Sequence, residues 1–248
     1  MKRRQLLQLG TALTGLASCA GAFSQAETRK VLRIVTAHLP PWVIEGGPEA
    51  GAAQALVVEL LRRLQMQPDI EYVPWLRAQH LTATRPRTAI FPLTRQPKRE
   101  TLFRWLAPLY EENYVFLTGQ HSRFDINRIG EMKNSRIALL RGGAQISMLQ
   151  ELGFRRLVEA SSIEEVHRFL LGGMADASFG ERNIIANSLR TRGQIDDFVI
   201  SAPVRTTTAW LAGSRDFDDS QVSQFEAAMA DMMADGTQKR ILKKHGLA

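Results

Sequence analysis

Residues 94–100, with the sequence TRQPKRE, bring together side chains that could bind an anion. The segment follows a predicted strand, and Pro97 suits the first position of a helix. Lys98 and Arg99 would then lie in a first helical turn, where the helix dipole disfavours cations. Such a departure from a local rule is typical of functional sites, and the guanidinium of Arg99 could grip a carboxylate through two parallel hydrogen bonds. The alternative is an exposed Arg99 that pairs with Glu100 or is solvated.

A second candidate anion site is the turn formed by Arg141, Gly142, Gly143 and Ala144. This turn lies between a predicted strand and a predicted helix, so its backbone N–H groups could receive an anion at a helix N-terminus. The alternative is a tight turn that requires small residues. Because ligands bind at the carboxyl ends of strands in open α/β sheets, the two candidates could belong to one binding site.

The sequence lacks the common motifs of enzyme active sites. It contains no GxSxG nucleophile motif, no GxxxxGK[ST] phosphate loop and no HExxH zinc motif. The histidines show no spacing typical of metal ligands; they are His38, His80, His121, His167 and His245. The sequence therefore predicts no catalytic residue set, no metal site and no cofactor.

An alternation of strands and helices must position these residues. Strands are expected at residues 31–37, 69–73, 89–93, 136–140, 157–158 and 175–179. Helices are expected at residues 51–64, 76–83, 143–153, 162–171, 182–190, 218–234 and 237–244, with Gly236 between the last two. Extended segments are expected at residues 114–118, 198–201 and 206–212. Strands that alternate with helices in this way predict two α/β lobes with mostly parallel sheets.

The composition is that of a globular protein. The chain has 248 residues, of which 44% are hydrophobic and 23% charged, so collagen-like and wholly disordered classes are excluded. This length allows one large domain or two lobes of roughly 100 residues each, and either can bury a proper core. The net charge is +7, but Lys2, Arg3 and Arg4 lie in an N-terminal segment that contains no acidic residue. The remaining excess is mild and dispersed, which argues against a nucleic-acid partner.

The N-terminal segment indicates export. Basic residues precede a modest apolar run at residues 6–17, which is too short to span a ~30 Å hydrocarbon core. Ordinary cleavage after the sequence SQA at 24–26 would remove residues 1–26 as a signal peptide. The lipobox-like sequence LASC at 16–19 would instead remove residues 1–18 and leave a lipid anchor on Cys19, the only cysteine. Arg3 and Arg4 also resemble a twin-arginine signal, so the export route stays open between this and the ordinary one.

The C-terminal string ADGTQKRILKK at residues 234–244 resembles the terminal helix of family 3 extracellular solute-binding proteins, the polar amino-acid receptors of ABC importers. Other family motifs follow in the right order. They are T-x-x-x-x-R from Thr94 to Arg99, the lobe-crossing segment Leu109-Tyr110, Gly142-Gly143-Ala144 after a strand, and G-x-x-D-A at residues 173–177. The resemblance covers essentially all of the chain from about Val31 onward.

The resemblance implies the two-lobed, type II periplasmic binding protein fold, with a ligand cleft between the lobes and two crossing segments. It implies a first lobe formed by residues 29–115 and completed by 206–248 with the C-terminal helices, and a second lobe formed by residues 116–205. It further implies a monomeric, non-catalytic receptor in the periplasm. Such a receptor binds an amino acid or a similar small carboxylate and hands it to the membrane permease of an ABC importer.

Individual residues take roles from the family pattern. Arg99 resembles the residue that clamps the ligand α-carboxylate, helped by the Thr94 hydroxyl and by backbone N–H groups at Gly143 and Ala144. Glu181 falls where the family has the acid that binds the α-ammonium; the alternative is a residue that only favours a helix start.

The resemblance to the family also suggests side chains that could line the cleft. Trp42 and Trp75 lie near positions that line it, with core packing as the alternative. Arg77 and Arg141 could suit a second acidic group on the ligand, or could be surface charges.

The sequence also departs from the family. The family has an acidic segment at the start of the first helix, whereas this chain has GAAQA at residues 51–55. Pro92 also replaces a residue that is commonly polar in the family, and Ala144 lacks the hydroxyl that is usual at its position. These departures leave the ligand open. Two other functions also stay open: a cyclohexadienyl or arogenate dehydratase on the same fold, with Glu181 as proton donor, and a binding protein that feeds a sensor.

Overall fold

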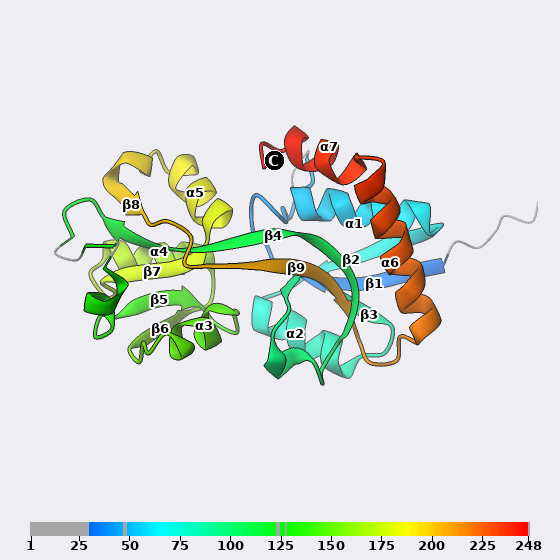
Figure 1. Ribbon diagram of the computed structural model, residues 1–248, viewed down its shortest axis with the longest axis horizontal. Coiled ribbons are helices and arrows are strands. Elements are labelled where there is room, and N and C mark those ends of the chain that lie inside the picture. Colours follow the sequence, from blue (N-terminus) through cyan, green and yellow to red (C-terminus); the bar gives the residue numbers. More distant parts are fainter. Residues whose placement is uncertain (1–29, 47–48, 123–124, 127, 248) are drawn as a thin grey trace, which may run out of the picture.

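The computed structural model describes residues 30–46, 49–122, 125–126 and 128–247. The predicted export signal, including Cys19, lies outside these residues. Figure 1 shows two lobes joined by two long strands that run side by side. These strands are β4, Arg104–Gly119, and β9, Arg205–Gly213, which pair in antiparallel fashion. The extended run expected at 114–118 is the far end of β4.

The described strands form one mixed sheet with the order β2-β1-β3-β9-β4-β7-β5-β6, and β8 pairs with β4 at the side. Besides β4 and β9, they are β1 Lys30–Thr36, β2 Met66–Tyr72, β3 Thr88–Thr94, β5 Ile137–Leu140, β6 Leu157–Ala160, β7 Ala177–Glu181 and β8 Phe198–Ile200. Within each lobe the neighbouring strands β2-β1-β3 and β7-β5-β6 are parallel, whereas every pairing with β4 or β9 is antiparallel. The predicted α/β alternation therefore produces the two parallel groups, and the crossing strands link them.

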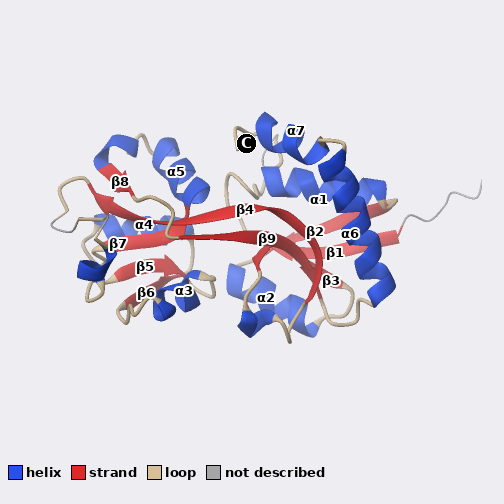
Figure 2. Ribbon diagram, in the orientation of Figure 1, coloured by secondary structure: helices blue, strands red, loops and turns tan. Residues whose placement is uncertain are grey.

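Helices cover both sides of the strands in each lobe (Figure 2). The first lobe carries α1 Ala52–Arg63, α2 Trp75–Thr84, α6 Asp219–Ala234 and α7 Thr237–Lys244. The second lobe carries α3 Gln145–Glu151, α4 Ile163–Leu171 and α5 Arg182–Thr191. Among the described residues, no helix is long and apolar enough to cross a membrane.

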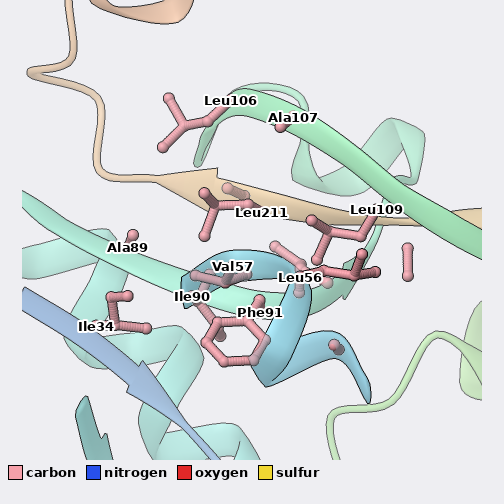
Figure 3. Packing of buried hydrophobic residues seen from close by; sticks show 14 of the residues in the cluster. Ile34, Leu56, Val57, Ala89, Ile90, Phe91, Leu106, Ala107, Leu109 and Leu211 are labelled. Atoms are coloured by element: carbon pink, nitrogen blue, oxygen red, sulfur yellow. The ribbon is translucent and has the colours of Figure 1, made fainter. Parts of the chain in front are cut away.

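The core of the first lobe forms around β3. All seven residues of this strand are buried, as expected for a strand with neighbours on both edges and helices on both faces. Its Ile90 and Phe91 belong to one apolar cluster with Leu56 of α1 and Leu211 of β9 (Figure 3). Because this core is continuous from β1 to the crossing strands, the end of β3 is held rigidly where the sequence places Thr94.

The C-terminal helices pack on the first lobe. Phe225 and Met229 of α6 belong to the same core cluster as α1. Local signals explain the bounds of these helices: Asp218 and Gln221 form a reciprocal capping box at the start of α6, and Gly236 adopts a left-handed φ of 75° between α6 and α7. The chain thus returns to the lobe where it began.

Some predicted elements differ from the structure. The second strand, Met66–Tyr72, begins earlier than expected because its whole length pairs with β1. The strand expected at 175–179 is Ala177–Glu181, so Glu181 ends a strand. The helix expected after Pro97 is a three-residue 3-10 helix, Pro97–Arg99, which places Arg99 at its end. The prediction of a first α-helical turn at Arg99 is therefore wrong.

Candidate functional site

A cavity of about 60 Å³ lies between the two lobes. The first lobe contributes Trp75, Thr94 and Arg99, and the crossing strand β4 contributes Glu112 and Tyr114. The second lobe contributes side chains from α3, α4, β7 and α5, which include Gln145, His167, Ser178 and Glu181. A cavity of this size holds only a few water molecules, at ~10–15 Å³ each, so a bound amino acid requires the lobes to lie further apart than they do in this structure.

Arg99 is a buried cation without an acidic partner. Arg99 is 7% exposed. Nη1 donates to the Thr94 carbonyl at 2.9 Å, and Nη2 donates to Gln79 Oε1 at 3.0 Å and to the Gly142 carbonyl at 2.9 Å. Among the described residues, no carboxylate oxygen lies within 4.0 Å of it, and burial lowers its pKa while arginine still stays charged. Glu100 pairs with Arg95 instead, so the exposed alternative for Arg99 is wrong.

Thr94, the last residue of β3, lies in a hydrogen-bonded cluster with two residues of β4. Its hydroxyl donates to Glu112 Oε2 at 2.8 Å and lies 2.9 Å from the Tyr114 hydroxyl. Burial is the main reason that the pKa of Glu112 rises from 4.5 to about 8; the carboxylate of Glu181 adds to this effect, and the Thr94 hydrogen bond opposes it. Burial therefore favours the protonated, neutral form of Glu112 at pH 7.

Sequence reasoning did not single out Glu112 and Tyr114. They lie on the crossing strand next to the segment Leu109-Tyr110, and only the pairing of distant strands brings them to Thr94. An acid between buried aromatic residues in a strand, as in the sequence YEENY at 110–114, is the signal that could have pointed to them.

Glu181 both caps a helix and lines the cavity. Its Oε2 accepts from the backbone N–H of Ile184 at 2.9 Å, which caps α5, and from Trp42 Nε1 at 2.9 Å. Its Oε1 accepts from Asn183 Nδ2 at 3.1 Å. Burial raises the pKa of Glu181, and these donors act in the opposite direction. The two interpretations of Glu181 from the sequence, ligand contact and helix start, are thus compatible.

The two tryptophans differ in position. Trp75 lines the cavity at the start of α2. Trp42 is 1% exposed and stacks on Tyr110, with ring centroids 3.5 Å apart. Trp42 therefore belongs to the core and reaches the site through its indole N–H on Glu181.

The glycine turn before α3 is tightly packed. Gly142 has a left-handed φ of 71°, and the Gly143 N–H donates to the Leu140 carbonyl at 3.0 Å, so this N–H is not available to a ligand. A Cβ on Gly143 would lie 1.9 Å from Gln145 Oε1 and 2.9 Å from Leu140 O. Because of this turn, α3 begins at Gln145, two residues later than the predicted start at residue 143. Ala144 is buried beside the cavity.

Arg77 and Arg141 lie outside the cavity. Both are exposed, and both line a separate groove beside α2. The nearest acidic oxygen to Arg141 Nε is Glu159 Oε2 at 3.9 Å. The prediction that these residues could meet a second acidic group in the cleft is not supported, because the surface alternative fits their exposure.

Within the part of the chain that the structure describes, four side-chain hydrogen bonds join the lobes around the cavity. Gln79 Nε2 and Arg99 Nη2 each donate to the Gly142 carbonyl at 2.9 Å. Gln96 Nε2 donates to the Ala144 carbonyl at 2.9 Å, and the fourth bond joins Trp42 to Glu181. The first lobe supplies every donor and the second lobe every acceptor. These contacts form or break when the lobes close or open.

The second lobe brings further polar groups that the sequence did not single out. His167, whose spacing suggested no metal site, is 3% exposed and its Nδ1 lies 2.7 Å from Ser188 Oγ. Burial lowers its pKa to about 4. Within the described part of the chain, no cluster of three or more His, Cys, Asp or Glu side chains is arranged to hold a metal.

Comparisons with known proteins find matches among solved structures. No protein-family model matches the sequence, and no curated protein sequence matches it. A variant of ArgBP from T. maritima matches with a TM-score of 0.76 and 17% identity over 87% of this chain and 95% of that one. A histidine kinase sensor domain with similarity to periplasmic binding proteins gives 0.78 and 16% over 87% and 96%. An arginine 3rd transport system periplasmic binding protein from Legionella pneumophila gives 0.73 and 17% over 87% and 99%.

The chain has the two-lobed fold of periplasmic binding proteins. The predicted fold class, α/β with two lobes, is therefore confirmed. In these comparisons the likeness extends along most of each matched chain, so neither lobe is an addition to the fold. Of these three structures, two are binding proteins and one is a sensor domain.

Proposed function

We propose that this protein is a receptor that closes on an amino acid or a similar small carboxylate between its lobes. The observation that carries this proposal is the buried guanidinium of Arg99, which faces the cavity with only neutral acceptors. A buried charge is normally paired, and a ligand carboxylate supplies the missing partner through two charge-assisted hydrogen bonds. Thr94 lies beside this guanidinium and accepts from it through its carbonyl, whereas its hydroxyl donates to Glu112.

Glu181 supports the choice of an amino acid among small carboxylates. Its two oxygens line the cavity and accept hydrogen bonds from Trp42, Ile184 and Asn183. A ligand ammonium that replaces or shares one of these donors would form a charge-assisted hydrogen bond with the carboxylate. Neutral Glu112 adds no second negative charge, so the cavity would balance a zwitterion with one cation and one anion.

The transport role rests on the export signal predicted for residues 1–26, or 1–18 with a lipid anchor on Cys19, and on the matched binding proteins. In this proposal the monomeric receptor works in the periplasm and delivers its ligand to the permease of an ABC importer. Permease and ATPase genes beside its own gene would support that partner. A sensor gene in their place would favour a signalling role, as in the matched sensor domain.

A screen for ligands tests the receptor role. Thermal shift of the purified protein against the common L-amino acids and small carboxylates identifies a ligand, and calorimetry measures its affinity. We expect Arg99→Ala to fold and to lose ~2–5 kcal/mol of binding free energy, because the variant leaves the ligand carboxylate buried without its partner. Arg95→Ala is the matched control: Arg95 is half-exposed and pairs with Glu100, so its loss should leave the affinity unchanged. Equal affinity of Arg99→Ala and the parent would refute this site.

An enzymatic function is the second candidate, and Glu112 is the observation that favours it. A carboxylic acid that stays protonated at neutral pH beside Arg99 could donate a proton to a departing hydroxyl of a prephenate-like substrate. Glu181 suits that role less well, because it accepts three hydrogen bonds as an anion would. Incubation with prephenate and arogenate, followed by ultraviolet detection of an aromatic product, separates a dehydratase from a receptor that binds without turnover.

A further inference from the structure

Three side chains that line the cavity carry a buried polar atom without a hydrogen-bond partner among the described residues. They are His167 Nε2 on α4, Ser178 Oγ on β7 and Gln145 Oε1 on α3, on residues with 3%, 1% and 8% exposure. Buried polar side-chain atoms in folded proteins are nearly always paired. All three residues line the cavity that holds Arg99, and they belong to the second lobe. The cavity therefore contains unpaired polar groups that the contacts proposed for a ligand carboxylate and ammonium do not use.

The fold places two of these residues, Ser178 and His167, on the same side of the second-lobe sheet. Ser178 and Gly180 alternate with Phe179 along β7, and a Cβ on Gly180 would lie 3.4 Å from Ile185 Cδ1 of α5. His167 of α4 shares a hydrogen bond with Ser188, which lies on α5 one turn after Ile185. Ser178 and His167 thus face the space under α5, whereas Phe179 packs into the core on the other side of the sheet.

The hydrogen that His167 presents to the cavity depends on the direction of its hydrogen bond with Ser188. The Ser188 hydroxyl lies 2.7 Å from His167 Nδ1, and the tautomer of the ring decides which of the two donates. When this hydroxyl donates to Nδ1, the imidazole hydrogen lies on Nε2, which faces the cavity as a donor. The low pKa of His167, about 4, keeps the ring neutral at pH 7. The site thus offers an N–H donor and a hydroxyl, and neither carries a charge.

The geometry points to a specificity subsite in which His167 and Ser178 bind a neutral, hydrogen-bond-accepting group on the ligand side chain, such as an amide carbonyl. This inference rests on the proposed receptor function. A ligand ammonium or guanidinium at this position would face the imidazole N–H, donor against donor, and would meet no acid there. The acidic side chains that line the cavity are Glu112, in the Thr94 cluster, and Glu181. The subsite should therefore reject a cationic side chain.

Ser178→Ala tests the subsite on the intact chain with three probes: L-glutamine, L-norvaline and L-arginine. Glutamine and norvaline share the carboxylate and ammonium, but only glutamine has an amide. We expect the parent to bind glutamine more tightly than norvaline and arginine. The substitution should weaken glutamine binding ~tenfold and norvaline binding less than twofold, because only glutamine loses a hydrogen bond of ~1.4 kcal/mol. The double variant His167→Phe/Ser188→Ala should show the same pattern.

Ser135→Ala is the matched control, since Ser135 is also a buried serine of the second lobe with an unpartnered hydroxyl, but it does not line the cavity. It should change no affinity. A readout without ligand complements these measurements: Ser178→Ala should leave Tm equal or higher, because it removes an unpaired buried hydroxyl.

Several results would overturn the subsite. Tighter binding of arginine than of glutamine would do so and leave the receptor function intact. An equal loss for glutamine and norvaline, or a fall in Tm on Ser178→Ala, would assign Ser178 to structure. Failure of the parent to bind any amino acid or small carboxylate would refute the receptor function, and the subsite with it.

Discussion

Glu181 shows how one side chain can hold an element in place and still belong to a binding site. As the residue between β7 and α5, it caps the helix, and the same carboxylate receives the indole N–H of Trp42 from the other lobe. Its position is therefore determined by contacts that exist without a ligand. Such preorganisation favours binding, because little side-chain freedom is lost when a ligand arrives.

The substitution Glu181→Gln separates these two roles. It keeps the shape but replaces a charge-assisted bond to the ligand ammonium by a neutral one, so amino-acid affinity should fall by ~1–3 kcal/mol. Calorimetry should show a much smaller loss for carboxylates that lack an amine. If amino acids bind the variant as tightly as the parent, Glu181 only caps α5, and a simple carboxylate becomes the better ligand.

At the scale of elements, the turn from β5 into α3 connects local backbone geometry with lobe closure. Gly142 adopts a positive φ, and its carbonyl accepts from Gln79 and Arg99 of the first lobe. A Cβ at this position would lie 2.9 Å from Leu76 Cδ1 and 3.1 Å from Gln79 Nε2, both on α2. The glycine thus permits the turn and also permits the two lobes to approach.

Gly142→Ala should therefore weaken ligand binding as well as lower stability. Gly173→Ala is the matched control, because Gly173 has a similar φ of 68° in the same lobe but no atom within 4 Å of its Cβ position. Both variants carry the backbone strain of ~1–2 kcal/mol and should lower Tm to a similar degree. Only Gly142→Ala should reduce affinity and leave the liganded protein more open in small-angle X-ray scattering. Equal affinity of the two variants would show that the side chains of α2 move aside for the added Cβ without a loss of binding free energy.

Elements with local signals are the part that the sequence predicts best. The helix expected at 237–244 is α7, Thr237–Lys244, because Gly236 ends the preceding helix through its own backbone. Strand order, by contrast, depends on pairings between distant segments. Arg99 could be singled out because it follows a strand and breaks a local preference. His167 offers no such local signal, and Glu112 offers only its place between aromatic residues of a strand. Their partners Ser188 and Thr94 lie 21 and 18 positions away and reach them only in the folded chain.

The whole molecule is built so that the two sides of the cleft complement each other. The first lobe presents donors, from Arg99, Gln79, Gln96 and Trp42, and the second lobe presents the acceptors that meet them. A ligand carboxylate at Arg99 would compete with the Gly142 carbonyl for the same guanidinium. Binding therefore exchanges some contacts between the lobes for contacts through the ligand, which is the expected chemistry of hinge closure.

Glu112, on the strand that crosses between the lobes, should make the stability of the molecule depend on pH. In the unfolded chain this carboxyl loses its proton near pH 4.5, whereas in the folded protein, where Arg99, Tyr114 and Glu181 surround it, the pKa is about 8. The folded state thus binds more protons between these values, and the contribution of Glu112 to the free energy of unfolding falls as the pH rises from about 4.5 to about 8.

Glu112→Gln, which stays neutral at every pH, should remove this dependence. Urea unfolding of parent and variant at several pH values between 5 and 8.5 should show a stability difference that shifts in favour of the variant as the pH rises. The effect of His167 is common to both proteins and cancels in the difference, whereas the coupling between Glu181 and Glu112 is part of the difference that is measured. The exposed neighbour Glu111 provides the control, since Glu111→Gln changes charge on the same strand outside the cavity. A constant difference between parent and Glu112→Gln would mean that Glu112 is ionised in the folded protein, and the cavity would then hold two negative charges opposite Arg99 and favour a more cationic ligand.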